Sequence, residues 1–323
     1  MYHSVAIVGA GAVGASLAAM MLDAGLPVTV VADGERASRM RSRGIAVNGT
    51  RYTDRVDDDP RVNGPYELVI VATKSTGLGS ALPLVVDAAG RDGVVMSLLN
   101  GITSEAIIRA ALASADGSSG TGSPGRVVPA MILGIDAVRA DGQVTYLNRG
   151  TIHFGRDGFT GRSDPGPDDR TLRSVEETLS AAAIPCRRSD TITRTLWWKF
   201  MINVGINQCS AVLRAPYGLF QESDEARALM LSAMEEVLDL SDREGTGLTR
   251  ADIDAWIETL MGLDPGGKTS MLQDIEAGRP TEVDLFAGTA IEIAARHGLE
   301  VPVNTTLYRI IRGLERRQAG SGQ

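Results

Sequence analysis

The first half of the chain alternates short apolar runs with stretches of helical periodicity. The apolar runs have the length of strands buried on both faces, as in a parallel sheet. They are Val5–Val8, the run that ends at Asp33, Leu68–Val71 and Val94–Leu98. An amphipathic helix is expected at Ala12–Ala24, between the first two runs. This order predicts a parallel sheet whose strands are connected by helices.

Shorter strands and loops are expected in the remainder of this half. Asn48-Gly49 is a favoured type I′ turn, so Gly44–Val56 is predicted to be a hairpin. The other strand-like segments are Val127–Ala130, Gln143–Leu147, Thr151–Phe154 and, as a strand or connector, Ile184–Arg187. Residues 114–125 and 155–170 have the composition of surface loops, and a helix is expected at Thr171–Ala183.

The second half shows helical periods and little strand signal from Thr191 onward. Helices are expected at residues 194–214, Ser223–Gly245 with Ser223 as its cap, Thr249–Met261, from 269 onward, Glu282–His297 and Asn304–Arg317. The domain boundary therefore falls near Ser189. We predict an α/β protein with an N-terminal Rossmann-type doubly wound domain at residues 1–189, followed by an all-α C-terminal domain at residues 190–323.

One of these helices carries a narrow polar stripe. Lys199, Asn203 and Asn207 recur every four residues and share a face, while large apolar residues occupy most other directions. Such a helix is buried nearly all round, and a buried ammonium or amide without a partner is costly. A ligand site would supply the partners. The alternative is a solvated stripe on an ordinary amphipathic helix.

A glycine-rich turn follows the first predicted strand. It has the pattern G-x-G-x-x-G and consists of Gly9, Ala10, Gly11, Ala12, Val13 and Gly14. The glycines allow a tight turn, close approach of a pyrophosphate to backbone N–H groups, and close packing of the helix on the sheet. Between a strand and a helix, this motif predicts a dinucleotide site. The alternative is a glycine turn that binds nothing.

Three polar residues follow predicted strands, at the edge where ligands of doubly wound sheets collect. Asp33 would bind ribose hydroxyls and repel a 2′-phosphate, which favours NAD over NADP, although Arg36 and Arg39 are near. Lys74 would contact the adenosine end of the cofactor, and Asn100 the nicotinamide ribose or the substrate. The alternatives are solvated side chains for Asp33 and Lys74 and an ordinary Asn-Gly turn for Asn100.

Composition narrows the partners and the compartment. The 323 residues carry a net charge of −8 and no long Lys/Arg run, which argues against nucleic acid and anionic membranes as partners. With no leader or membrane-spanning run expected, and only Cys186 and Cys209 as cysteines, we predict a soluble cytoplasmic protein. No metal site is predicted, because His3, His153 and His297 are scattered and no metal-type Cys/His spacing exists.

Several motifs together resemble the ketopantoate reductase family over essentially the whole chain. They are the glycine-rich turn, Lys74, Leu99-Asn100-Gly101, the Lys199, Asn203 and Asn207 stripe, and Ser270-Met-Leu-Gln-Asp followed by Thr281-Glu282-Val283-Asp284. The resemblance implies a Rossmann domain, a helical domain, a cleft between them, and reduction of 2-dehydropantoate to pantoate by NADPH.

The resemblance also implies a role for each matching residue. Lys199 would polarise the 2-oxo group and supply a proton, and Glu282 would orient the lysine or the substrate hydroxyl. Asn203, Asn207 and Ser270 would bind the substrate, while Lys74 and Asn100 would bind the cofactor. The chemistry is coherent, because hydride addition to a ketone develops negative charge on oxygen, which an ammonium stabilises and protonates. Glu282 is also a carboxylate near a helix N-terminus, where the helix dipole favours it.

Two positions depart from the family pattern. Asp33 stands where the family has an arginine for the 2′-phosphate, so NADH is favoured here although NADPH is the family cofactor. Tyr217 falls where the family has a substrate-contacting asparagine, so it is expected to line the pocket and alter the choice of 2-oxo acid. We expect a homodimeric NAD(P)H-dependent reductase of a small 2-oxo acid. The alternatives are reduction of another carbonyl compound, or a regulator that senses dinucleotides without turnover.

Overall fold

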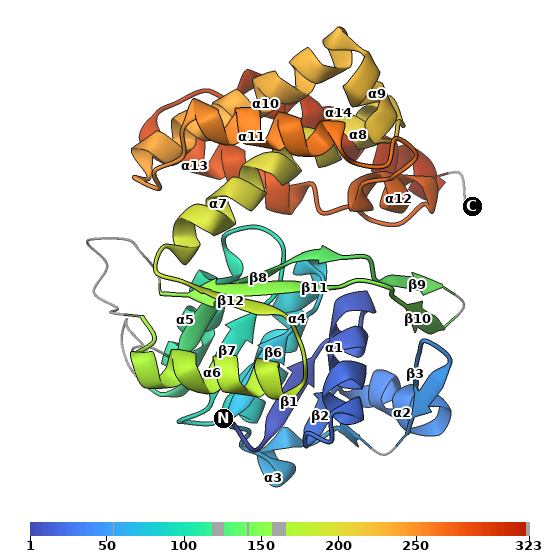
Figure 1. Cartoon of the computed structure of the whole chain (residues 1–323), viewed down its shortest axis with the longest axis vertical. Helices are drawn as coiled ribbons and strands as arrows, with labels where there is room; N and C mark the ends of the chain where they lie inside the picture. Colours follow the sequence, from blue (N-terminus) through green and yellow to red (C-terminus); the bar gives the residue numbers. More distant parts are fainter. Residues whose placement is uncertain (54, 118–125, 141, 157–165, 321–323) are drawn as a thin grey trace. The chain divides into compact units, whose positions relative to one another are not determined.

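The structure is a computed structural model that describes the chain except for residues 54, 118–125, 141, 157–165 and 321–323 (Figure 1). The chain divides into two compact units. One comprises Met1–Asn100 and Ser104–Thr193, and the other comprises Gly101–Thr103 and Arg194–Gln323. Most of the two predicted surface loops lies outside the described residues.

The first unit is built on an eight-stranded sheet. From one edge to the other, its strands are β12 (Cys186–Ser189), β11 (Arg149–Gly155), β8 (Val127–Ile135), β7 (Val94–Ser97), β6 (Leu68–Val71), β1 (Val5–Val8), β2 (Val28–Val31) and β5 (Val56–Asp57). The strands from β8 to β5 are all parallel, and β11 pairs antiparallel with β8. These six parallel strands follow the doubly wound order 3-2-1-4-5-6, which confirms the predicted Rossmann-type fold.

Helices cover both faces of this sheet. They are α1 (Ala12–Asp23), α2 (Gly34–Arg43), α3 (Pro60–Asn63), α4 (Ser75–Ala89), α5 (Ser104–Ala115) and α6 (Asp169–Ala181). Val5 and Ile7 of β1 pack in one buried cluster with α1 and α6. Ala6 and Val8 face the other way and pack in a second cluster with α4 and α5. Burial on both faces explains why these strands are continuous apolar runs.

The predicted hairpin over Gly44–Val56 forms, but in a separate sheet. Its strands are β3 (Ile45–Val47) and β4 (Thr50–Tyr52). The φ angles of Asn48 and Gly49 are 47° and 83°, and the type I′ turn requires both to be positive. Val56 itself belongs to β5 of the main sheet.

A second hairpin completes the small sheet. It consists of β9 (Val138–Ala140) and β10 (Gln143–Thr145), and the strand order is β4-β3-β10-β9. The sheet is fixed to the first helix through a buried apolar cluster formed by Ala15, Ala19, Val47 and Val144. The small sheet therefore lies over the helix that follows the glycine-rich turn.

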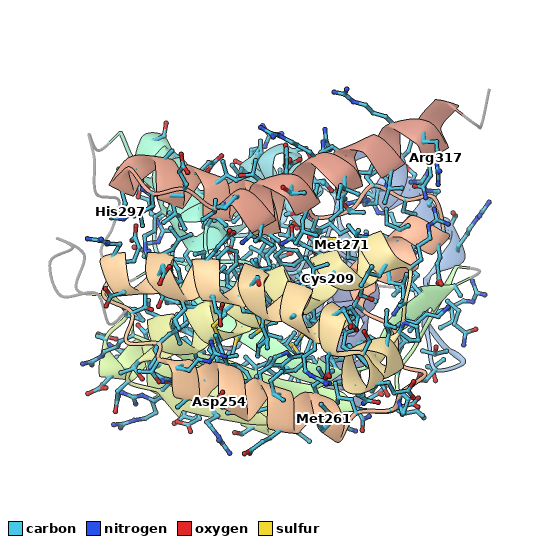
Figure 2. All side chains as sticks on the ribbon, turned by 90° about the horizontal axis from the view of Figure 1, so that it is seen from above. Cys209, Asp254, Met261, Met271, His297 and Arg317 are labelled. Carbon is cyan, nitrogen blue, oxygen red and sulfur yellow. The ribbon has the colours of Figure 1, made fainter. Side chains whose placement is uncertain are left out.

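The second unit is helical, as predicted. It contains α7 (Ile192–Ile202), η1 (Asn203–Asn207), α8 (Gln208–Leu213), α9 (Tyr217–Glu222), α10 (Asp224–Arg243), α11 (Arg250–Met261), α12 (Ser270–Glu276), η2 (Asp284–Gly288), α13 (Thr289–His297) and α14 (Pro302–Gly320). Ser223 caps α10, because its side chain accepts from Ala226 N–H at 3.2 Å. In Figure 2, Asp254 and Met261 mark α11 and His297 marks the end of α13. None of the described helices is long and apolar enough to cross a membrane.

Two π-helical turns interrupt helices that the sequence predicted to be regular. The turn η1 separates α7 from α8 within the helix expected at 194–214, and η2 precedes α13. At Gly205 in η1 a Cβ atom would lie 2.5 Å from Met234 Cγ of α10. Hydrophobic periodicity does not detect one extra residue in a single turn, so neither π turn was predicted. Such turns occur frequently at functional sites.

Candidate functional site

The turn after β1 needs glycine for packing at only two of its three motif positions. Gly9 has a φ of 104°, and a Cβ atom on it would lie 2.7 Å from the backbone nitrogen of Thr73. A Cβ atom on Gly14 would lie 1.9 Å from the Gly9 carbonyl oxygen. At Gly11, however, the nearest neighbour would be 3.9 Å away. Packing therefore does not require glycine at Gly11, and the open space beside it leaves room for a ligand to approach the backbone.

Helix α1 starts directly after this turn. Its first helical hydrogen bond runs from Ala15 N–H to Gly11 O at 3.1 Å, so the N–H groups of Ala12, Val13 and Gly14 have no partner within the helix. No acidic side chain lies in the first turn of α1. The positive end of the helix dipole is therefore available to a phosphate group.

A cavity of about 980 Å³ opens at the carboxyl ends of β1, β2 and β6. β1 and β6 flank the point where the strand order reverses, which is where doubly wound sheets bind ligands. The charged residues that line the cavity are Asp33, Glu35, Arg36, Arg39, Arg43, Lys74 and Arg139. Five of these are cationic and two are anionic, so the cavity attracts an anionic ligand. Its volume and charge suit a dinucleotide.

The predicted cofactor residues fall into two groups. Gly9, Ala10, Gly11, Asp33 and Lys74 line the cavity. The others do not line it: Ala12, Val13 and Gly14 form the start of α1, and Asn100 lies in the turn after β7.

Asp33 lies in a mixed electrostatic environment. It is exposed, precedes α2, and its carboxylate does not cap that helix. Arg39 pairs with Glu35 at 3.6 Å, and Arg36 is exposed on the same helix. A ribose hydroxyl at this position would meet a carboxylate acceptor, whereas a 2′-phosphate would meet both signs of charge.

Lys199 lies in the last turn of α7 and has an altered pKa. Burial lowers its pKa from 10.5 to about 8, because the ammonium is removed from water, while the negative charge of Glu282 acts in the opposite direction. Glu282 lies in the turn before η2 and, like Lys199, is partly exposed. A lysine with this pKa is mostly protonated at neutral pH and can release its proton readily.

Asn203, Asn207 and Ser270 form a hydrogen-bonded chain whose direction is fixed. The Met271 backbone N–H can only donate, and it points at Asn207 Oδ1 at 3.4 Å. Ser270 Oγ donates to the same oxygen at 3.1 Å. The other end of the Asn207 amide, Nδ2, donates to Asn203 Oδ1 at 3.0 Å. The Asn203 amide is thereby oriented, with its Nδ2 pointing away from this chain.

These hydrogen bonds distinguish the three predicted substrate residues. Asn207 is only 6% exposed, and both ends of its amide are engaged by protein groups. Ser270 has one hydroxyl proton, which it gives to Asn207. Within the described residues, no protein group accepts a hydrogen bond from Asn203 Nδ2. Asn203 is therefore the member of the chain best able to donate to a ligand.

Tyr217 begins α9 and packs on the loop before α12. Its N–H donates to Gly267 O at 3.0 Å, and a Cβ atom on Gly267 would lie 2.9 Å from Tyr217 Cδ2. Burial raises the pKa of the phenol. Because Ser270 follows Gly267 by three residues, Tyr217 supports the segment that carries this predicted substrate residue.

Sequence reasoning missed Arg139, which lines the cavity from β9. Its guanidinium donates to the Ala10 carbonyl in the glycine-rich turn, 129 positions away. No local motif reports such a contact. The dipeptide Asp141-Gly142, directly before the predicted strand Gln143–Leu147, is, however, a hairpin signal that could have revealed β9.

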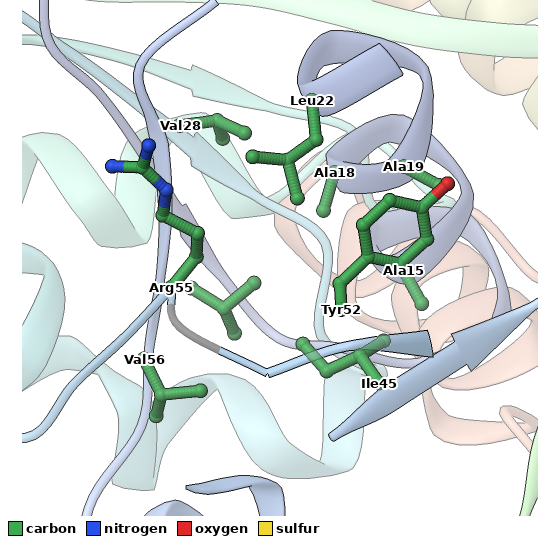
Figure 3. Close-up of a pocket in the computed structure, with 10 residues that line it drawn as sticks. Ala15, Ala18, Ala19, Leu22, Val28, Ile45, Tyr52, Arg55 and Val56 are labelled. Carbon is green, nitrogen blue, oxygen red and sulfur yellow. The ribbon is translucent and has the colours of Figure 1, made fainter. Parts of the chain in front are cut away.

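A much smaller hollow lies between α1 and the β3–β4 hairpin (Figure 3). Its volume is about 10 Å³, and apolar side chains such as Leu22, Val28 and Ile45 line most of it. It can hold about one water molecule and no substrate. The described residues also contain no group of three or more His, Cys, Asp and Glu that could hold a metal ion.

Both halves of the chain match models of one protein family. Residues 5–158 match the ketopantoate reductase PanE/ApbA model, and residues 191–315 match the ketopantoate reductase PanE/ApbA C-terminal model. A 2-dehydropantoate 2-reductase from Pyrococcus horikoshii is 26% identical over 317 residues, which cover 98% of each chain. Another, from Halobacterium salinarum, is 26% identical over 97% of this chain and 99% of its own.

Solved structures show the same architecture. A PanE/ApbA family ketopantoate reductase from Ralstonia eutropha JMP134 is 25% identical, with a TM-score of 0.81 over 98% of this chain and 99% of its own. A D-mandelate dehydrogenase, solved with NADH and anilino(oxo)acetate, has a TM-score of 0.82 over the same shares of the two chains. At 20% identity, this second likeness is one of fold.

Proposed function

The chain belongs to the ketopantoate reductase family, and from this premise we propose that it reduces a small 2-oxo acid to the 2-hydroxy acid with NAD(P)H. The first reaction to test is the conversion of 2-dehydropantoate to pantoate, which is the activity named for the relatives from Pyrococcus and Halobacterium. The observation that carries the proposal is Lys199, whose pKa burial lowers to about 8 although the negative charge of Glu282 acts to raise it. The oriented Asn203 amide lies one helical turn further along the chain.

Lys199 would donate its proton to the oxo oxygen of the substrate. When bound, the reduced nicotinamide supplies the hydride that adds to the carbonyl carbon. The carbonyl oxygen then gains negative charge, which the ammonium stabilises as it forms and neutralises by proton transfer. Glu282 would keep Lys199 charged, because its carboxylate raises the lysine pKa. Solvent would return a proton to the neutral amine after each turnover.

Asn203 would bind an acceptor group of the substrate. Its Nδ2 carries two N–H donors, and its orientation is set through Asn207. A carboxylate or the developing alkoxide oxygen matches these donors. In this proposal Asn207 and Ser270 act mainly by orienting Asn203, and Ser270 reaches the substrate carboxylate only if its hydroxyl leaves Asn207.

The cofactor would be held by the residues around the glycine-rich turn. Backbone N–H groups of Gly9–Gly14 would bind the diphosphate, and Asp33 the adenosine ribose hydroxyls. Lys74 would contact the adenosine end, and Asn100 the nicotinamide ribose. We propose a preference for NADH, because the Asp33 carboxylate opposes the roughly two negative charges of a 2′-phosphate. Arg36 weakens that repulsion, so NADPH would still be used.

Tyr217 would decide which 2-oxo acid fits. A partly buried phenol in place of a compact amide changes both the shape and the hydrogen bonding of a pocket wall. Tyr217→Asn should therefore raise kcat/KM for 2-dehydropantoate relative to other 2-oxo acids. An unchanged substrate profile would show that Tyr217 lies outside the substrate site. The alternative that the enzyme reduces another carbonyl compound would then lose the residue that supports it.

The proposal is tested with a panel of 2-oxo acids, assayed with NADH and NADPH by loss of nicotinamide absorbance. In the best reaction, Lys199→Ala should lower kcat by roughly a hundredfold or more, as expected for loss of a general acid. Cofactor affinity should stay nearly unchanged and serves as the control. Near-normal turnover in Lys199→Ala would contradict lysine catalysis.

Binding of dinucleotide without turnover of any 2-oxo acid would instead indicate a dinucleotide-sensing regulator. The Lys199, Glu282 and Asn203 arrangement argues against this alternative, because a sensor has no need for a proton donor. A homodimer remains a prediction, which sedimentation velocity tests directly.

A further inference from the structure

The small sheet places the guanidinium of Arg139 beside the glycine-rich turn. Arg139 lies on β9, which pairs with β10, and the buried contacts of Val47 and Val144 with Ala15 and Ala19 fix this sheet on α1. From this position the Arg139 guanidinium donates to the carbonyl of Ala10. Its location relative to the turn is thus set by the core as well as by its own hydrogen bond.

A bond to one carbonyl leaves most of the guanidinium available. The group carries five N–H donors in a planar fork that matches phosphate oxygens. Arg139 is exposed and lines the 980 Å³ cavity together with Gly9, Ala10 and Gly11. The segment Gly9–Gly14 itself contains no charged side chain. Within this segment, only backbone N–H groups could offset the charge of a diphosphate, and Arg139 is the cation that donates a hydrogen bond to the segment itself.

We propose that Arg139 binds the diphosphate of the dinucleotide, bridging it to the Ala10 carbonyl. This inference rests on the proposed use of NAD(P)H. The diphosphate is favoured over a 2′-phosphate because Ala10 follows β1, whereas Asp33 and Arg36, at the predicted ribose site, follow β2. A charge-assisted, bidentate contact of this kind is among the stronger hydrogen-bonding arrangements in proteins.

The test compares the binding of NADH, NADPH and ADP-ribose to the unmodified protein and to Arg139→Gln, measured by titration calorimetry without substrate. Affinity for all three ligands should fall by about tenfold or more and by a similar factor, since all three contain the diphosphate. Arg139→Lys, which keeps the charge but not the fork, should recover part of the loss. The affinity difference between unmodified protein and Arg139→Gln should shrink as salt is raised.

Arg36→Gln is the matched control, because Arg36 lines the same cavity from α2. It should weaken NADPH more than NADH or ADP-ribose. If Arg139→Gln likewise weakens NADPH alone, Arg139 belongs at the 2′-phosphate and the inference is wrong. Unchanged affinities with reduced thermal stability would assign Arg139 a structural role and also overturn it. If the unmodified protein binds none of the three ligands, the proposed function fails together with the inference.

Discussion

Raising the pH from 7 to 9 should lower kcat/KM for carbonyl reduction about tenfold if Lys199 is the general acid. With a pKa of about 8, the lysine is protonated in about nine-tenths of molecules at pH 7 and about one-tenth at pH 9. A lysine with the ordinary pKa of 10.5 would stay almost fully protonated over this range. The decline therefore reports burial of this particular ammonium.

Two variants show whether the decline belongs to Lys199. Glu282→Gln removes the negative charge that raises the lysine pKa, so the decline should move to lower pH. Lys199→Arg keeps a cation that does not titrate in this range, so whatever activity remains should lose the decline. Initial rates at low substrate concentration and saturating cofactor, at constant ionic strength, measure kcat/KM across the range. An unmodified enzyme that stays fully active to pH 9, or a decline that persists in Lys199→Arg, would refute the assignment.

The same pKa has a consequence for stability with a definite sign. The folded-state pKa lies below the unfolded value, so between about pH 8 and 10.5 the unfolded chain binds more protons and the Lys199 contribution to stability rises with pH. Below pH 8 the buried ammonium costs about 3 kcal/mol, from roughly 1.4 kcal/mol for each tenfold change in proton affinity. In urea unfolding, Lys199→Met should have a larger free energy of unfolding than the unmodified protein near neutral pH. This difference should shrink as the pH approaches 10.5.

Three further predictions concern the helices and the cofactor. Asn207→Asp and Asn203→Ala should both raise KM for the 2-oxo acid. In Asn207→Asp a carboxylate oxygen would face Asn203 Oδ1, so the Asn203 amide would rotate to present Nδ2 instead. A normal KM in Asn207→Asp would show that Asn207 does not orient Asn203. Gly205→Ala should destabilise the protein by about 1–3 kcal/mol in urea unfolding, because the added methyl would lie 2.5 Å from Met234 Cγ; equal stability would mean that the buried methionine moves aside at little cost. Asp33→Arg should improve kcat/KM for NADPH by about tenfold or more, with Asp33→Asn as the control for charge alone; no change in either variant would place Asp33 in solvent.

The Rossmann-type sheet was predictable from the sequence because its signals are local. Strands buried on both faces are continuous apolar runs. In the small sheet, the positive φ angles at Asn48 and Gly49 likewise set the β3–β4 turn locally. The helices α2, α3, α4, α5 and α9 were not predicted, and the strand β9 was missed. Helix α2 is mostly exposed, with Ala37 as its only buried residue, so the sheet rather than an apolar face determines its position.

The candidate site was predicted as a set of residues but not as an arrangement. Spacing brought Lys199, Asn203 and Asn207 to one helix face, and the structure adds the Met271 N–H that fixes the direction of the amides. That contact joins residues 64 positions apart and has no sequence signature. The lowered pKa of Lys199 depends on its burial, which spacing alone does not reveal.

The π turn at Asn203–Asn207 limits how this segment can change during evolution or engineering. Each residue of an α-helix advances the chain by about 100°, so deleting one residue from the turn would rotate everything after it relative to α7. The buried face of α8 and the polar face at Lys199 could then no longer both keep their present contacts. A substitution in this segment alters the contacts of one side chain, whereas a deletion would rotate the buried face of α8 relative to the polar face at Lys199. Length should therefore be held more strictly than residue identity between Lys199 and Leu213.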